Sequence, residues 1–196
     1  AEHDHAQYHD LVARGLPLVC VNGYADDLDV PFISVDDAEA MRLAVAHLVQ
    51  LGHERIGLAV GQQRYVPSRR KVDGFTDAVV GAGLGGRRGR GVMVEHTLFS
   101  VEGGRAAAGR LIDRGATAVV CGSDLMALGA VRAARQRGLA VPADLSVVGF
   151  DDSPLMAFTS PGLTTIRQPV DAMAQAAAEA LLDAIGGSPV PATEYL

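Results

Sequence analysis

Apolar residues along the chain follow two alternating periods. Short apolar runs of strand length are separated by longer segments in which apolar residues recur every three or four positions, as on one face of a helix. The pattern predicts strands at 16–21, 32–35, 55–60, 91–95, 117–121, 145–150 and 163–167. It predicts helices between Asp36 and Gly52, over 72–82, 101–114 and 123–137, and after Pro169.

Strands that alternate with amphipathic helices predict an α/β fold, with a doubly wound parallel sheet and helices on both of its faces. The composition agrees, because 48% of the residues are apolar, only 5% are aromatic and Trp is absent, which favours an aliphatic core. Before Leu16 the pattern predicts only one helix. Either the first lobe is incomplete here, or its partner strands lie upstream of Ala1.

Charge and cysteine content narrow the classes of partner. The formal net charge of −6 gives the chain as a whole no attraction for nucleic acid, and no apolar run is long enough to cross a bilayer. Residues 1–15 carry no secretory pattern, and Cys20 and Cys121 lie inside apolar runs, as reduced buried thiols do. We therefore expect a protein of the reducing cytoplasm that does not contact the membrane.

Polar residues follow four of the predicted strands at their carboxyl ends, where ligands bind in open parallel sheets. Asp151 comes directly after an apolar strand, and we expect its carboxylate to accept hydrogen bonds from a ligand. Arg69 carries a planar donor fork that suits the same polar, hydroxylated ligand. Lys71 would join Arg69 at the ligand only if a helix begins around these residues. The alternative is that Arg69, Arg70 and Lys71 together form a basic first helical turn exposed to solvent.

Several of these polar residues also have purely structural interpretations. Asp124 and Asp152 are of types that cap helices and form turns, and Ser123 shares that preference. The GAGLGG run at 81–86 has dinucleotide-site spacing but follows a helix and precedes a strand, so it predicts a helix end and a loop. The basic run 87–90 is interpreted as a solvated loop.

Other chemistry lacks a supporting pattern. His3, His5 and His9, with Asp4 and Asp10, have metal-like spacing, but a terminal segment rich in His explains them without a metal. No Ser/His/Asp set with a supporting motif occurs. We expect no catalytic residue, no metal and no cofactor.

Two long segments resemble a known family. The run DLMALGAVRAARQRGLAVPADLSVVGFDDSPLMAFTSPGLTTIRQP, residues 124–169, is similar to the effector-binding core of LacI-type bacterial transcription regulators. So is VDDAEAMRLAVAHLVQLGHERIGLAVG, residues 35–61, followed by RRKVDGF. The resemblance covers residues 11–187 with its segments in family order. Lys71 stands where relatives usually have a second Arg, and Met41 stands where Gly is common.

The resemblance implies a type I periplasmic-binding-protein-like core, in which two lobes are joined by three crossovers and a small polar effector, of sugar type, binds between them. The expected lobes are residues 1–52 with 168–187, and residues 53–167 with 188–196. An aromatic ring for ligand stacking is expected at Phe99, or one position away at Leu98. The ligand-binding residues carried over by matching motif, together with Phe99 and Lys71, are Arg69, Ser123, Asp151, Gln168 and Asp36.

Relatives in this family begin with a DNA-binding helix-turn-helix, and no such segment precedes Leu16. The resemblance therefore implies a sensing and dimerising part of a repressor, a homodimer that reaches operator DNA through a segment outside this sequence. One rival is an exported solute-binding protein of a transport system. Another is an enzyme that uses Asp151 as a base.

Overall fold

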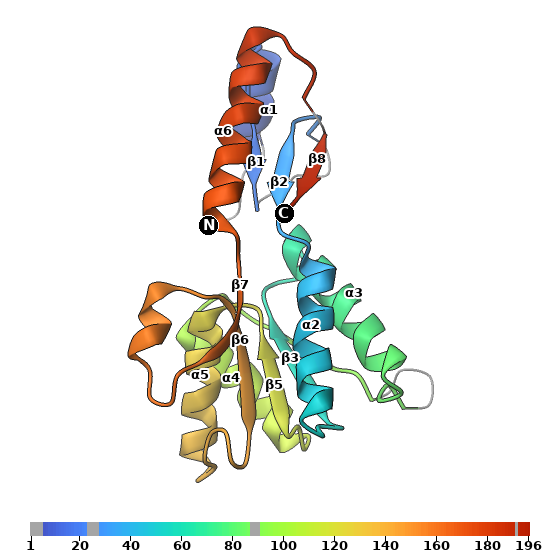
Figure 1. Ribbon diagram of the computed structural model, residues 1–196, viewed down its shortest axis with the longest axis vertical. Coiled ribbons are helices and arrows are strands. Elements are labelled where there is room, and N and C mark those ends of the chain that lie inside the picture. The colour runs from blue at the N-terminus through green and yellow to red at the C-terminus, as the bar shows by residue number, and fades with distance from the viewer. Residues whose placement is uncertain (1–5, 23–27, 87–90, 191) are drawn as a thin grey trace. The chain divides into compact units, whose positions relative to one another are not determined.

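The computed structural model describes residues 6–22, 28–86, 91–190 and 192–196 (Figure 1). Two compact units form, one from residues 1–36 with 169–196 and the other from residues 37–168. We call them unit 1 and unit 2. The chain passes between them at 36–37 and again at 168–169.

Unit 2 is built on a five-stranded sheet in which neighbouring strands run parallel, in the order β4-β3-β5-β6-β7. Each predicted strand of this region is confirmed within a few residues. The strands are β3 Ile56–Val60, β4 Met93–His96, β5 Ala118–Cys121, β6 Ser146–Asp151 and β7 Thr164–Arg167.

The helices of unit 2 cover both faces of this sheet, which confirms the doubly wound α/β prediction (Figure 1). Helices α2 (Asp37–Gln50) and α3 (Val66–Gly81) pack against each other on one face. On the other face lie α4 (Val101–Asp113) and α5 (Asp124–Gln136), also in mutual contact. A 3-10 helix, η2 (Pro154–Phe158), was not predicted and connects β6 to β7.

Small side chains allow α4 and α5 to pack closely on the sheet and on each other. The buried cluster on this face joins Val119, Cys121 and Val147 of the strands to a set of helix alanines. A Cβ atom added at Gly129 of α5 would lie 2.1 Å from the carbonyl oxygen of Val101. The composition rich in Ala and Gly thus produces an aliphatic core with near backbone contact between the helices.

Unit 1 contains a three-stranded parallel sheet in the order β1-β2-β8, formed by β1 Cys20–Val21, β2 Phe32–Ser34 and β8 Thr193–Tyr195. Helices α1 (Ala6–Ala13) and α6 (Val170–Gly186) belong to the same unit. β8 was not predicted from the apolar pattern. It joins the sheet through backbone pairing with β2, which three residues can provide without an apolar period.

The predicted lobe boundaries need correction in two places, apart from Gln168, which belongs to unit 2. Residues 37–52 were assigned to the first lobe, but α2 packs on α3 and belongs to unit 2. Residues 188–196 were assigned to the second lobe, but β8 pairs with β2 in unit 1. The third crossover implied by the family resemblance is therefore not among the described passages.

Glycines end the helices as the sequence predicts. Gly52 follows α2 with φ +86°, and Gly83 follows α3 with φ +78°. Both values lie in the left-handed region that glycine adopts readily. The 81–86 run is therefore a helix end and not a dinucleotide loop, while the basic run 87–90 lies outside the described residues.

Cys20 and Cys121 are both free thiols, Cys20 half-buried and Cys121 fully buried. Burial raises the pKa of each thiol, which keeps the sulfur protonated and weakly reactive. Among the described helices, none combines the length and the apolar character that crossing a membrane requires.

The close contact of α4 and α5 predicts that Gly129→Ala destabilises the protein, because the added methyl group would push against the backbone at Val101 and Arg105. Overpacking of this kind costs about 1–3 kcal/mol. Urea unfolding should show this loss in the free energy of unfolding. Gly81→Ala is the control, since its Cβ would meet nothing within 4 Å, and it should leave stability unchanged or slightly raised.

Candidate functional site

The candidate site lies at the carboxyl edge of the sheet in unit 2. Because the strands are parallel, the ends of β3, β5 and β6 meet at one edge, as the pairing of Ala59 with Cys121 and of Val120 with Val148 requires. β3 is followed by Gly61, and β5 by Gly122 and Ser123. β6 itself ends on Asp151.

Asp151 has an unusual backbone conformation. Its φ is +117°, and that of Asp152 is +54°, both in a region that residues other than glycine rarely adopt. Strained backbone of this kind persists when surrounding contacts hold it, and it is common at ligand sites. The half-buried side chain of Asp151 accepts a hydrogen bond at 2.5 Å from Nε2 of Gln168. Asp152 instead accepts from Nε of Arg167 at 2.6 Å.

The pKa of Asp151 is raised, chiefly because burial removes water from its carboxylate, with the negative charge of Asp124 adding to the effect. The hydrogen bonds from Gln168 and from the backbone of Asp124, together with the charge of Lys71, act in the opposite direction without cancelling it. An ionised Asp151 is therefore incompletely stabilised. A ligand that donates hydrogen bonds to it would supply what is missing.

Ser123 and Asp124 organise the first turn of α5. Ser123 is the N-cap, and its Oγ accepts from the backbone N–H of Met126 at 3.3 Å. The buried Asp124 accepts from the backbone N–H of Ser153 at 2.8 Å and from Oγ1 of Thr165 at 2.6 Å. Asp124 thus has a structural role, as expected, but it ties neighbouring segments to α5 and does not cap the helix, which Ser123 does. The Ser123 hydroxyl also carries a proton that it can donate elsewhere.

Lys71 has a partner inside the protein. Its Nζ forms a buried ion pair with Oδ1 of Asp37 and lies 3.8 Å from the ring centroid of Phe150. The sequence prediction treated Lys71 as a ligand contact provided that a helix begins near it, but α3 already begins at Val66. Lys71 therefore turns into the core, and we do not carry it forward as a direct ligand contact. Asp37, which the sequence analysis missed, is the more informative residue.

Arg69 lies on the same helix but is only half-buried. Its Nη1 donates to the carbonyl oxygen of Arg64 at 3.2 Å, and the carbonyl oxygen of Gln63 lies 3.5 Å from the same Nη1. These contacts hold the segment that follows β3 against the start of α3. No hydrogen bond or ion pair between Arg69 and Asp151 is seen among the described residues, so their predicted joint contact with a ligand remains a prediction.

Phe99 is the aromatic residue that the sequence left uncertain by one position. Its ring lies so close to Gly61 that a Cβ there would come within 2.0 Å of Cε2, and a Cβ added at Gly122 would lie 3.5 Å from its Cε1. The Tyr65 ring is 6.2 Å away, centroid to centroid. Phe99 therefore spans the ends of β3 and β5, with 43% of its surface exposed.

The remaining predicted residues are distributed as follows. Gln168 joins Asp151 in unit 2, whereas Asp36 is an exposed residue of unit 1 whose backbone N–H donates to the carbonyl oxygen of Leu196. His3 and His5 lie outside the described residues. Within the described part of the chain, no three His, Cys, Asp or Glu side chains are arranged to hold a metal.

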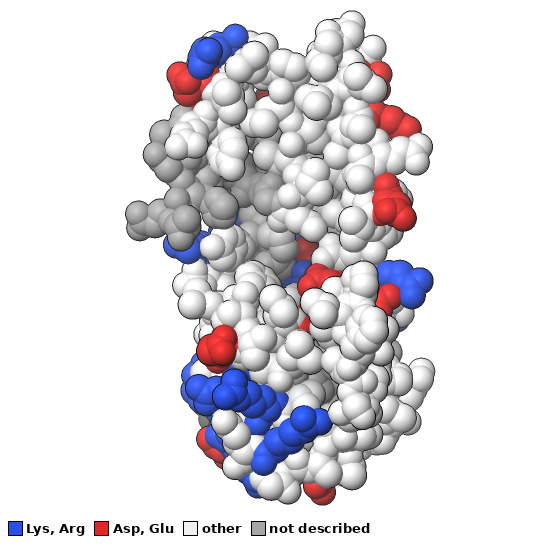
Figure 2. Space-filling model, turned by 90° about the vertical axis from the view of Figure 1, so that its left-hand side faces the viewer, with Lys and Arg blue, Asp and Glu red and all other residues white. Residues whose placement is uncertain are grey.

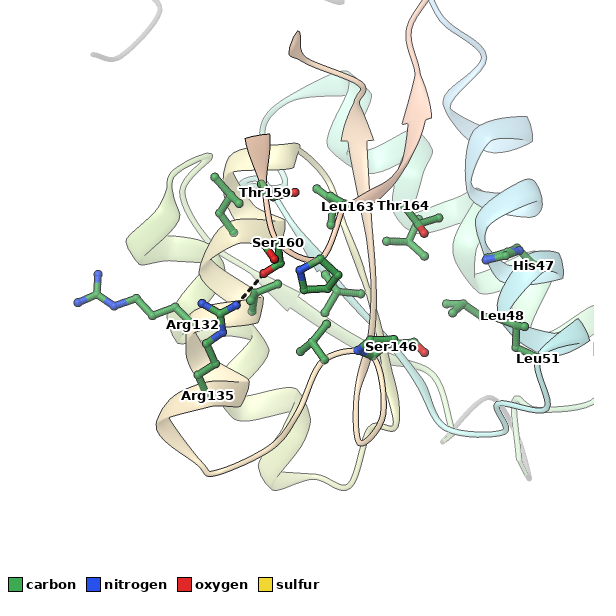
Figure 3. A pocket seen from close by; sticks show the side chains of 18 residues that line it. His47, Leu48, Leu51, Arg132, Arg135, Ser146, Thr159, Ser160, Leu163 and Thr164 are labelled. Atoms are coloured by element: carbon green, nitrogen blue, oxygen red, sulfur yellow. Dashed lines mark hydrogen bonds between the residues drawn. The ribbon is translucent and has the colours of Figure 1, made fainter. Parts of the chain in front are cut away.

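Two hollows accompany unit 2. One, of about 490 Å³, lies beside the ends of β3 and β4 and is lined by residues that include Gln62 and His96. The other, of about 580 Å³, lies near the start of β6 and contains none of the predicted site residues. Figure 3 shows that Arg135 reaches Ser160 there, its Nη2 donating to the carbonyl oxygen at 3.1 Å, while Arg132 points away.

Comparison with known proteins gives matches along nearly the whole chain. The periplasmic binding protein-like domain matches residues 45–196. An uncharacterized HTH-type transcriptional regulator in the aml 5′ region of Streptomyces limosus is 61% identical over 98% of this chain and 55% of its own length. The HTH-type transcriptional regulator MalR of Streptomyces coelicolor is 56% identical over 98% of this chain and 56% of its own. The chain thus spans about half the length of these curated relatives.

Solved structures that resemble this chain are also transcription regulators. The complex of the transcriptional regulator CelR with cellobiose has a TM-score of 0.87 and 30% identity, covering 98% of this chain and 60% of that one. The lac repressor dimer bound to operator and an anti-inducer has a TM-score of 0.83 and 28% identity, covering 97% and 65%. A LacI family regulator from Enterococcus faecium with bound ribose has a TM-score of 0.85 and 27% identity, covering 98% and 70%.

The parallel sheet with its polar carboxyl edge defines a domain of the periplasmic-binding-protein type. The chain belongs to the periplasmic binding protein-like family, in the branch formed by LacI-type transcription regulators.

The raised pKa of Asp151 predicts a stability that depends on pH. Between the ordinary aspartate pKa of the unfolded chain and the raised pKa of the folded one, the folded state binds more protons, so rising pH lowers stability. Asp151→Asn, which tolerates positive φ, should therefore have the higher free energy of unfolding at pH 7. The difference should disappear below the ordinary aspartate pKa when both proteins are unfolded in urea.

Asp113 provides a control of opposite sign, because its hydrogen bonds with Arg137 lower its pKa. Asp113→Asn should lose stability at pH 7 relative to the parent protein and approach it in acid. An Asp151→Asn protein that is less stable at every pH would contradict the assignment of an under-stabilised carboxylate.

Proposed function

We propose that this chain is the effector-sensing and dimerising part of a LacI-type repressor of the cytoplasm, and that it binds a small hydroxylated ligand, of sugar class, at the carboxyl edge of unit 2. The observation that carries the proposal is Asp151, a half-buried carboxylate on strained backbone whose charge lacks full stabilisation. Relatives with bound cellobiose and ribose support the ligand class.

The chemistry of the edge suits a sugar. Asp151 accepts hydrogen bonds, while the half-buried Gln168 amide and the Ser123 hydroxyl can both donate and accept. Arg69 lies half-buried beside the loop after β3 and offers a guanidinium to ligand hydroxyls. Phe99 presents a partly exposed ring on which the apolar face of a pyranose can pack. Asp36, in unit 1, is retained as a further candidate contact.

The ligand is proposed to favour one arrangement of the two units over another. A ligand shifts such an equilibrium only by the difference between its affinities for the two arrangements. In the intact protein, a helix-turn-helix outside this sequence would read operator DNA, and ligand affinity and operator affinity would then be reciprocally linked. The net charge of −6 agrees with DNA contact being made elsewhere.

The proposed dimer surface is an apolar patch formed by Leu125 of α5 with Leu155 and Phe158 of η2. They are 47%, 67% and 86% exposed, respectively. The hydrogen bond from Ser153 to Asp124 brings the start of η2 beside the start of α5. Figure 2 looks onto this side of unit 2, where Lys and Arg gather toward the lower end and the surface above them is mostly uncharged. We propose that a second copy of this chain covers the patch, and the similar lac repressor structure, which is a dimer, supports this.

Two rivals are distinguishable by experiment. An exported solute-binding protein would carry a leader peptide and no helix-turn-helix upstream of this segment. An enzyme would convert a bound sugar, and would lose that turnover in Asp151→Asn. The regulators among the relatives favour the repressor over both.

Arg69→Ala should weaken binding of the sugar that the protein selects from cellobiose, maltose and ribose by about 2 kcal/mol, because a charged donor is removed from a partly desolvated edge. Isothermal titration calorimetry measures the change. Arg42→Ala is the control, since Arg42 pairs with Glu39 on the exposed side of α2 and should leave affinity unchanged. Wild-type affinity in Arg69→Ala would refute its assignment.

Phe158→Asp should raise the dimer dissociation constant about thirtyfold or more, because a central aromatic anchor typically contributes about 2 kcal/mol or more. Sedimentation equilibrium at micromolar concentration would then show monomers. Val80→Asp, at a 50% exposed position near the end of α3, should remain dimeric. A dimer that persists in Phe158→Asp would exclude this patch as the interface.

A further inference from the structure

The two passages between the units meet unit 2 at residues with buried or half-buried polar contacts. The first passage enters unit 2 at Asp37, and the second leaves it at Gln168. Asp37 is held by Lys71, and Gln168 is held by Asp151. Of the two holding residues, Asp151 belongs to the candidate site, and Lys71 lies in the core beside Phe150.

The first contact is fully enclosed. The side chains of Asp37 and Lys71 are 0% and 5% exposed, so the ion pair is shielded from water and salt. Asp37 is the first residue of α2, and Lys71 belongs to α3. Backbone packing reinforces the pair, since a Cβ at Gly74 of α3 would lie 2.5 Å from Cα of Ala38. The start of α2 is thus fixed on α3.

The second contact has two parts. The Gln168 side chain donates from Nε2 to Oδ1 of Asp151 at 2.5 Å, and its backbone N–H faces the Asp151 carbonyl oxygen at 3.4 Å. Pro169 follows immediately and precedes α6 of unit 1. The last residue of unit 2 is therefore attached to the end of β6 through Asp151.

One ammonium group acts on both contacts. Lys71 pairs with Asp37, lies over the ring of Phe150, and its charge stabilises the ionised form of the adjoining Asp151. Asp124 acts on Asp151 with a like charge. A change in the charge or position of either carboxylate, Asp151 or Asp37, therefore alters the interactions of the same Lys71 ammonium group.

We propose that Lys71 and Asp151 are positioning residues that fasten the two connecting segments to unit 2, and that a sugar which donates hydrogen bonds to Asp151 displaces the Gln168 side chain and loosens the second segment. The ligand-dependent half rests on the proposed function. The fastening itself rests only on contacts within unit 2. Ligand occupancy would then be transmitted along the chain at 168–169 without any direct contact to α6.

Amide hydrogen exchange of the intact, ligand-free protein tests the fastening. The relevant amides are Met41, the first in α2 with a helical acceptor, and Gln168. Lys71→Met should speed exchange at both by about tenfold or more relative to Val120 in β5, which reports global opening, and Lys71→Arg should restore much of the protection. Equal acceleration at all three amides would mean a general loss of stability and would overturn the proposal.

Asp151 offers a matched pair of variants. Asp151→Asn keeps an acceptor oxygen for Gln168, whereas Asp151→Ala removes it. Exchange at Gln168 should be near the parent rate in the first and faster in the second. Arg167→Ala is the control, because Arg167 is 82% exposed and pairs with Asp152 at the neighbouring position. Parent-like exchange at Gln168 in Asp151→Ala would overturn the second fastening, even where Lys71→Met does not fold.

The ligand-dependent half is tested by adding whichever of cellobiose, maltose and ribose calorimetry shows to bind. Exchange at Gln168 should rise at saturation while that at Met41 stays constant. A bound sugar that leaves Gln168 unchanged or slows it would overturn this half. Failure of all three sugars to bind would count against the proposed ligand class, and the ligand-free measurements would still decide the fastening.

Discussion

The charge of Asp151 is the constraint on which the candidate site of unit 2 depends. Burial removes water from the carboxylate, and the hydrogen bonds from Gln168 and the backbone of Asp124, with the charge of Lys71, restore only part of the lost stabilisation. The backbone beneath it is held in a region that costs free energy for a residue other than glycine. A hydrogen-bond donor could supply the stabilisation that this carboxylate lacks, and the proposed donor is a hydroxylated ligand.

The architecture explains how so unfavourable a group is tolerated. The cost is local, while helices cover both faces of the parallel sheet beneath it and the aliphatic core under α4 and α5 is closely packed. β6 is paired on both sides, with β5 and with β7, so the strand that bears Asp151 is held along its length. Thr165 of β7 and the start of η2 are tied to Asp124, which fixes the chain immediately around the carboxylate.

The sequence was informative where periodicity or motif decides the outcome. Every predicted strand and helix of unit 2 formed, because apolar period and glycine stops act locally. β8 and the lobe boundaries were missed because three-residue pairing and helix-on-helix contact are set by residues far apart in the chain. The buried ion pair of Lys71 could not be predicted for the same reason, because its partner Asp37 is 34 positions away in the chain. The VDD run at 35–37 did indicate that Asp37 lies at the start of a helix. It could not indicate that the partner of Asp37 is Lys71.

The strand pairing at the end of the sequence has a practical consequence. The carbonyl oxygen of Leu196 accepts from Asp36, so residue 196 lies directly beside the first passage between the units. Both native thiols are wholly or partly buried with raised pKa values, and they should react slowly with maleimides. A cysteine introduced at the 37% exposed position 196 would therefore take a fluorescent dye selectively, at a point where emission responds to motion of that passage.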